Sequence, residues 1–161
     1  MANAKKRFGV IVASLLLAVG GGLMTSPQAS AASCYGDYCS NKDPQATGCS
    51  AGGFTQFGID VYYWKSLWAS NKAYAGRLEL RGSNTCGSTQ WARFTAMDTG
   101  FTYRIRAEQP ETGYTTSWQE VNTQRTSAWS NQIYSPRLCV RAHIQLWDAG
   151  VQRTDGYTKC R

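Results

Sequence analysis

Six cysteines constrain this chain more than any other feature of its sequence, and all of them lie beyond residue 33: Cys34, Cys39, Cys49, Cys86, Cys139 and Cys160. Small exported domains pair their cysteines, whereas cytosolic proteins keep them reduced. An even count therefore predicts three disulfide bonds and leaves no thiol for catalysis. Many pairings are possible, and short separations along the chain favour 34 with 39, 49 with 86 and 139 with 160. The spacing of Cys34 and Cys39 is looser than that of a zinc ligand pair, so we expect no metal.

The amino terminus has the three-part layout of a secretory signal. Lys5, Lys6 and Arg7 precede an apolar run over residues 8–19, and small residues fill positions 29–33. We expect residues 1–32 to form a signal peptide, with cleavage after Ala31 or Ala32. The apolar run is shorter than the roughly 20 residues of a membrane-spanning helix. The sequence thus predicts a secreted, extracellular protein that is not embedded in a membrane.

The charge of the chain bears on its partners. The full sequence has 17 Lys and Arg against 10 Asp and Glu, and three of the cations belong to the signal peptide, so 14 remain against 10. Most of the remaining cations are arginines, which suit forked contacts with carboxylates and phosphates. Outside the cell, an acidic protein surface or an anionic cell-wall polymer is then the expected partner, and nucleic acid is not.

Beyond the signal peptide we expect a Cys-rich arm over residues 33–53 and a β-rich domain over residues 54–161. The arm has almost no aliphatic residue to bury, so we expect it to be irregular and shaped by its disulfides. Alternation of apolar and polar residues predicts half-buried strands over residues 77–81, 101–108 and 138–147. Weaker patterns mark residues 58–64, 90–96, 113–118 and 132–134. The fold class is therefore all-β, a small disulfide-bonded sandwich or barrel.

Two segments carry a resemblance to a known family. The first is the arm from Cys34 to Cys49 with its Lys-Asp-Pro-Gln stretch (residues 42–45), and the second runs from Gly76 through Leu-Glu-Leu-Arg (residues 78–81) and Cys86 to Trp-Ala-Arg (residues 91–93). Over residues 34 to about 94 the chain resembles exported bacterial proteins catalogued as domain of unknown function 2690, common in actinomycetes. The resemblance implies an extracytoplasmic location, an actinomycete source and pairing of Cys49 with Cys86, and it supplies no activity.

The sequence gives little sign of catalysis. His143 is the only histidine, and strand alternation places it on a polar face between Arg141 and Gln145, where we expect a surface residue. The carboxylates Glu79 and Glu108 stand next to arginines, and such groups are more simply solvated or paired than catalytic. No phosphate loop or dinucleotide motif is present, so we expect no enzyme activity and no cofactor.

Binding surfaces are the alternative. Outward strand positions carry arginines that would form one basic face if their strands were neighbours, and exposed aromatic rings could act as anchors. Our candidate binding residues are Arg77, Arg81, Arg104, Arg106, Arg141, Trp147, Tyr35 and Tyr38. A stiff arm would also lose less entropy on docking than a flexible one.

We therefore expect a secreted, non-enzymatic binding or adaptor protein that acts through protein–protein contacts, as a component of an extracellular, toxin-type assembly. Three alternatives stay open: a binder of cell-wall polysaccharide, a small wall-active glycosidase that uses two of the carboxylates, and a secreted protease inhibitor.

Overall fold

The computed structural model describes residues 31–65, 70–98, 100–121 and 127–160, and its fold is all-β, as expected. Two short 3-10 helices, η1 (Gly36–Cys39) and η2 (Cys49–Gly52), precede the strands. The strands are β1 (Gly53–Trp64), β2 (Lys72–Ser83), β3 (Thr89–Ala96), β4 (Thr102–Gln109), β5 (Tyr114–Thr115), β6 (Gln119–Val121), β7 (Ser127–Trp129), β8 (Ile133–Tyr134), β9 (Arg141–Asp148) and β10 (Val151–Tyr157).

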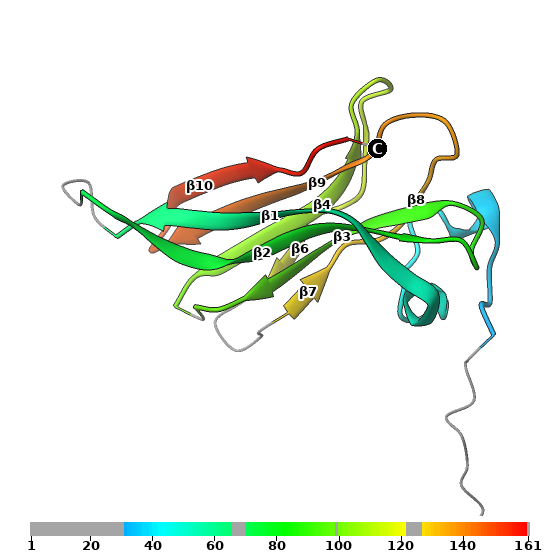
Figure 1. Ribbon diagram of the computed structural model, residues 1–161, viewed down its shortest axis with the longest axis horizontal. Coiled ribbons are helices and arrows are strands. Elements are labelled where there is room, and N and C mark those ends of the chain that lie inside the picture. Colours follow the sequence, from blue (N-terminus) through cyan, green and yellow to red (C-terminus); the bar gives the residue numbers. More distant parts are fainter. Residues whose placement is uncertain (1–30, 66–69, 99, 122–126, 161) are drawn as a thin grey trace, which may run out of the picture.

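The strands form two antiparallel sheets that pack face to face as a sandwich (Figure 1). Sheet A has the order β1-β2-β3-β7, with β8 also paired to β3. Sheet B has the order β10-β9-β4-β5, with β6 also paired to β4. The arm and the far end of the β1–β2 hairpin lie at opposite ends of the molecule (Figure 1).

The core lies between the sheets and follows the alternation of the sequence. Sheet A contributes Leu78, Leu80, Ala92 and Phe94, and sheet B contributes Tyr103, Ile105, Ala107, Ala142, Ile144 and Leu146. The rings of Phe94 and Tyr103 meet across the sandwich with centroids 4.8 Å apart. A side chain at every second position faces the opposite sheet, so the intervening positions form the two outer faces.

The strand expected over residues 138–147 begins later than its pattern suggested. β9 starts at Arg141, and Leu138 is 42% exposed instead of lying in the core. The stretch before Arg141 bonds to loops: the Ser135 hydroxyl donates to the Leu138 carbonyl, and the Cys139 N–H donates to the Glu111 carboxylate. These bonds replace the ladder that would have continued the strand.

Three of the strands have no counterpart among the sequence expectations. β10 is an edge strand without a fully buried side chain, so its residues show no alternation of apolar and polar types. β6 and β7 are three residues long, too short for a pattern to emerge. The weak pattern over residues 113–118 corresponds to the two-residue strand β5, and Trp118 lies outside any strand.

The segment 62–68 is rich in aromatic residues. β1 exposes Tyr62 and Trp64 and buries Tyr63, which is 7% exposed. Trp68 lies outside the described residues, as does the expected signal peptide up to residue 30. Within the described parts of the chain, no helix is long and apolar enough to cross a membrane.

Candidate binding site

All three expected disulfide bonds are confirmed: Cys34–Cys39, Cys49–Cys86 and Cys139–Cys160. The first closes η1, and the second ties η2 to the turn between β2 and β3. These two bonds pack against each other, because Cys34 Sγ lies 3.7 Å from Cys49 Sγ. They form a small buried cluster that replaces the aliphatic core the arm lacks.

Hydrogen bonds fix the arm to the segment around β8. The Asn41 N–H donates to the Gln132 carbonyl over 2.8 Å, and the Gln132 N–H donates to the Lys42 carbonyl over 2.9 Å. The fully buried Gln132 side chain also donates to the Thr47 hydroxyl. The arm is therefore an integral part of the folded domain.

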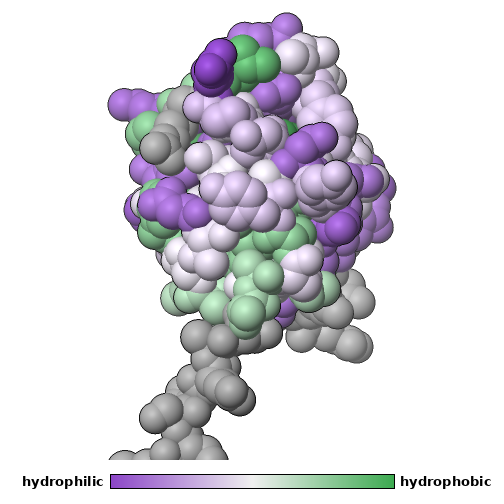
Figure 2. All heavy atoms as spheres, turned by 90° about the vertical axis from the view of Figure 1, so that its right-hand side faces the viewer, coloured by the Kyte–Doolittle hydropathy of each residue, from purple (hydrophilic) through white to green (hydrophobic). Residues whose placement is uncertain are grey.

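Two aromatic side chains project from this fixed arm. Tyr35 is 68% exposed and Tyr38 is 83% exposed, although large aromatic side chains are normally well buried. The Tyr35 ring lies directly over Gly87, where a Cβ atom would come within 3.0 Å of it. Figure 2 looks onto this end of the molecule, where weakly polar and hydrophobic residues occupy the centre and lower half and strongly hydrophilic residues lie around the upper, left and right margins.

The candidate arginines do not form one basic face. Arg77 and Arg81 lie on the outer face of sheet A, whereas Arg104, Arg106 and Arg141 lie on the outer face of sheet B. Trp147 also lies on sheet B, with the Arg104 guanidinium 5.4 Å from the centre of its ring. The arginines of β2 are separated from the others because β2 belongs to sheet A, the other layer of the sandwich.

Most arginines of the two outer faces, candidates and others, pair with carboxylates at 2.5–3.0 Å. The pairs are Arg77–Asp60, Arg93–Glu79, Arg104–Glu120, Arg106–Glu108, Arg141–Glu108 and Arg153–Asp148. Arg81 differs, because among the described residues it has no carboxylate within 4.0 Å. Its guanidinium donates instead to the Thr55 hydroxyl and the Gly53 carbonyl. Burial and the nearby Arg93 lower the pKa of the Arg81 guanidinium.

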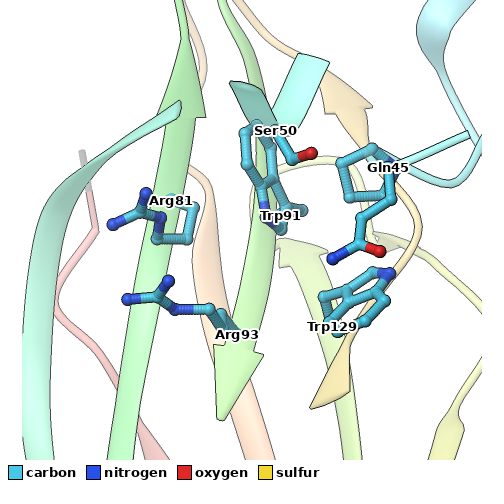
Figure 3. A pocket seen from close by; sticks show the side chains of 7 residues that line it. Gln45, Ser50, Arg81, Trp91, Arg93 and Trp129 are labelled. Carbon is cyan, nitrogen blue, oxygen red and sulfur yellow. The ribbon is translucent and has the colours of Figure 1, made fainter. Parts of the chain in front are cut away.

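A pocket of about 210 Å³ opens beside Arg81, between the arm and the outer face of sheet A (Figure 3). Its lining consists of Pro44, Gln45 and Ser50 from the arm and Arg81, Trp91, Arg93 and Trp129 from sheet A. In Figure 3 the two guanidinium groups lie on one side of the pocket, and Gln45 and Trp129 lie on the other. The Trp129 indole N–H donates to the Asp43 carboxylate over 3.1 Å, which holds this ring in place.

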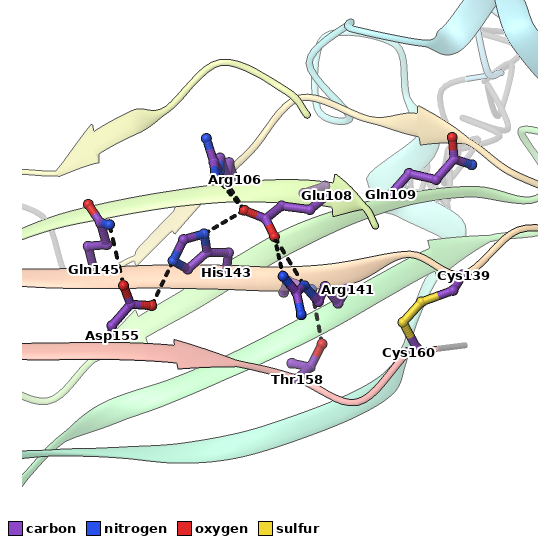
Figure 4. Close-up of polar contacts among 12 residues, drawn as sticks. Arg106, Glu108, Gln109, Cys139, Arg141, His143, Gln145, Asp155, Thr158 and Cys160 are labelled. Atoms are coloured by element: carbon purple, nitrogen blue, oxygen red, sulfur yellow. Dashed lines mark hydrogen bonds and ion pairs between the residues drawn. A yellow bond between two sulfur atoms is a disulfide. The ribbon is translucent and has the colours of Figure 1, made fainter. Parts of the chain in front are cut away.

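The outer face of sheet B carries a polar cluster centred on His143 (Figure 4). Its Nδ1 lies 2.6 Å from a Glu108 oxygen and its Nε2 lies 2.8 Å from an Asp155 oxygen. Glu108 also accepts hydrogen bonds from Arg106 and Arg141. Burial opposes the ionisation of Glu108, but the hydrogen bonds from His143 and Arg106 outweigh it, so the pKa of this carboxyl is lowered.

The expectation that His143 is a surface residue was wrong, because its side chain is 3% exposed. The Tyr157 ring stacks on it with centroids 4.1 Å apart, and the Trp118 ring meets it at 4.8 Å. The two covering rings belong to β10 and to the loop before β6. The alternation of residues within β9 gives no information about side chains from these other elements. Glu79 and Glu108 were expected to be either solvated or paired with arginines. Both are buried and form ion pairs with arginines, so pairing is confirmed.

The chemistry open to these groups follows from their contacts. Both ring nitrogens of His143 already have carboxylate partners, so neither is directed at a substrate position. The sulfur atoms of Cys34, Cys39, Cys49 and Cys86 lie within 4.8 Å of one another, the arrangement of a four-cysteine metal site. They are joined in two disulfides, however, and a metal would need them as thiolates.

The pocket and its aromatic wall have no signal in the local sequence pattern. Trp129 belongs to the short strand β7, which no pattern marked, and it meets the arm only because β7 pairs with β3. Gln45 and Trp129 line the same pocket although they lie far apart in the sequence, so no local pattern could bring them together. Comparisons with known proteins add no assignment: no family model, no curated protein and no solved structure matches this chain.

Proposed function

We propose that this is a secreted, non-enzymatic binding protein that attaches to an extracellular protein partner through its disulfide-stapled arm. The observation that carries the proposal is the exposure of Tyr35 and Tyr38 on a segment fixed by two disulfides and by hydrogen bonds to β8. Tyrosine is among the residues that contribute most to protein interfaces, since it buries a large area while losing few rotamers.

The rigidity of the arm supports a role in binding in addition to its structural role. A segment that is already ordered loses little conformational entropy on docking, so more of the contact energy remains as affinity. Tyr38 lies within η1, which the Cys34–Cys39 bond closes, and so its ring is presented at a defined position. We infer a partner with an apolar recess large enough for these two rings.

The setting of this interaction is outside the cell. The disulfide bonds fit an oxidising compartment, and the charged, apolar and small-residue regions of the amino terminus fit export. The resemblance of residues 34 to about 94 to domain of unknown function 2690 supports an exported actinomycete protein. In this proposal the protein is an adaptor within an extracellular, toxin-type assembly.

The test is capture of the partner from the culture supernatant of the source organism. Tagged mature protein is used as bait, and the retained proteins are identified by mass spectrometry and their stoichiometry is measured. The bait carrying Tyr38→Ala should lose the partner, with an affinity loss of tenfold or more, the size typical of an interface hot spot. The matched control is Tyr62→Ala, which removes a 47% exposed tyrosine near the hairpin end of β1. That end of β1 lies opposite the arm (Figure 1).

The results separate the possibilities clearly. A stoichiometric partner that is lost with Tyr38→Ala and kept with Tyr62→Ala supports the proposal. A partner retained equally by both variants places the interface elsewhere and refutes the role of the arm. Recovery of no stoichiometric partner refutes the adaptor function.

A further inference from the structure

We propose that the pocket between the arm and sheet A binds a pyranose ring that carries a carboxylate, the acidic sugar unit of an extracellular polysaccharide. This binding site is additional to the protein interface proposed above. It uses residues 44–50 of the arm and not the segment that carries Tyr35 and Tyr38. The proposal depends on an aromatic wall, two polar groups, an arginine that pairs with no carboxylate of the described residues, and the size of the pocket.

The aromatic wall is formed by Trp91 and Trp129. Trp91 is 2% exposed and forms a closed floor, since Gly53 of β1 approaches its ring so closely that an added Cβ would clash. Trp129 is partly exposed and is fixed through its N–H to Asp43. A rigid, partly exposed indole face such as that of Trp129 stacks on the C–H face of a sugar ring at little entropic cost, and the buried Trp91 supports the floor beneath.

The polar groups of the pocket are placed on its arm side. Among the described residues, the Gln45 side-chain amide and the Ser50 hydroxyl have no hydrogen-bond partner, and both line the pocket. The backbone around Gln45 is held by its N–H, which donates to the Asp43 carboxylate over 2.7 Å. An amide and a hydroxyl offer donors and acceptors together, which is what the hydroxyl groups of a sugar need.

The charge on the opposite side of the pocket favours an acidic ligand. Two arginines face one carboxylate there, because Glu79 accepts from Arg93 and reaches Arg81 only through the Thr55 hydroxyl. Hydrogen bonds from Thr55 and Arg93 outweigh burial and lower the pKa of Glu79, so this carboxyl is ionised. On this side of the pocket Glu79 pairs directly with Arg93, and Arg81 has no carboxylate of its own among the described residues. A ligand carboxylate beside Arg81 would supply that partner in a forked geometry.

The size of the pocket limits the ligand to a single ring. Pockets for drug-sized molecules measure about 300 to 1,000 Å³, whereas this one measures about 210 Å³. Its open side faces solvent, so a sugar unit within a polymer can enter while its neighbours remain outside. A ligand that makes a stacking contact, neutral hydrogen bonds and one ion pair in this pocket would be a uronic acid or a sugar with an acidic ether substituent.

The experiment compares matched acidic and neutral sugars by ligand-observed NMR and calorimetry on the mature protein. The probes are D-glucuronic acid against D-glucose, and N-acetylmuramic acid against N-acetylglucosamine. We expect the acidic member of at least one pair to bind about tenfold more tightly than its neutral partner, as for one charge-assisted hydrogen bond. Equal affinities within both pairs, or no binding of any probe at millimolar concentration, would overturn the proposal.

Variants assign the binding to this pocket. Arg81→Gln should remove the preference for the acidic sugar, while Arg77→Gln, on the same strand and outer face but outside the pocket, should keep it. Gln45→Ala, at an exposed position, should weaken every probe and leave the fold intact. An equal loss with Arg77→Gln would show general attraction to the sheet and refute the site. Tyr38→Ala should bind the sugar normally, so failure of the protein interface and failure of this site are distinguishable.

Discussion

Removing the Cys49–Cys86 bond should destabilise the protein more than removing the Cys34–Cys39 bond, although both lie in one cluster. A disulfide stabilises by restricting the unfolded chain, and the restriction grows with the logarithm of the loop that the bond closes. The separation of 37 residues between Cys49 and Cys86 corresponds to about 3.8 kcal/mol in this chain-entropy relation. The separation of five residues between Cys34 and Cys39 corresponds to about 2.1 kcal/mol.

The measurement is equilibrium urea unfolding of the protein, followed by tryptophan fluorescence. Each bond is removed as a double alanine variant, so that no free thiol remains. With an m-value of about 1.5 kcal/mol/M, the difference of about 1.7 kcal/mol separates the two midpoints by roughly 1 M. The pairs have similar packing, since their sulfur atoms contact each other, and loop length is the main difference between them.

A lower midpoint for the Cys34–Cys39 variant than for the Cys49–Cys86 variant would refute this reasoning. It would mean that the contacts of η1 in the folded state outweigh the restriction of the unfolded chain. The Cys139–Cys160 bond, which spans 21 residues, should fall between the two with about 3.3 kcal/mol.

Three further predictions concern the rest of the sandwich. Glu108→Gln should lower the free energy of unfolding, measured in urea titrations, by about 2 to 3 kcal/mol. The substitution leaves a buried histidine and two arginines without the carboxylate that they share. A loss below about 1 kcal/mol would contradict this prediction. The folded-state pKa values of Glu79 and Glu108 are lowered, so the stability that these carboxylates give the fold should be complete above pH 4.5, the ordinary pKa, and should decline as the pH falls below it. Thermal melts of the wild type between about pH 3 and pH 6 should show this decline. Glu108→Gln should make the dependence on pH weaker. Gly76→Ala should lower the free energy of unfolding by more than about 2 kcal/mol, because the added Cβ would clash with the Thr95 carbonyl. Gly113→Ala, which has open space around it, should lower it by only about 1 kcal/mol, because a left-handed backbone disfavours a side chain. Equal melting temperatures for the two variants would argue against the clash.

Much of the strand content was predictable because strand formation is read from neighbouring residues. The alternation of Tyr103, Ile105 and Ala107 with polar residues identified β4, and the same pattern identified the inward positions of β9. The disulfide pairing was also predictable, because cysteines that are close along the chain meet most easily. Edge strands such as β10 escaped, since a strand that buries little has no apolar alternation to detect.

The candidate sites were predictable only in part. Tyr35 and Tyr38 were candidate binding residues from the sequence, and both are exposed. The pocket, in contrast, depends on Trp129, which reaches the arm through the pairing of β7 with β3. Likewise, alternation placed His143 on the outer face correctly and its exposure wrongly, because Tyr157 and Trp118 cover it from other elements.

By itself, therefore, the sequence determined the class of the protein: an all-β chain with paired cysteines, an arm without an aliphatic core and apolar residues on one side of each main strand. Tertiary structure alone decided which strands share a sheet, and with it that Arg81 lies beside Trp91 and Trp129 while Arg104, Arg106 and Arg141 lie on the opposite layer. The physical reason is that periodicity is a local property, whereas the neighbours of an outer face are set by pairings between distant segments.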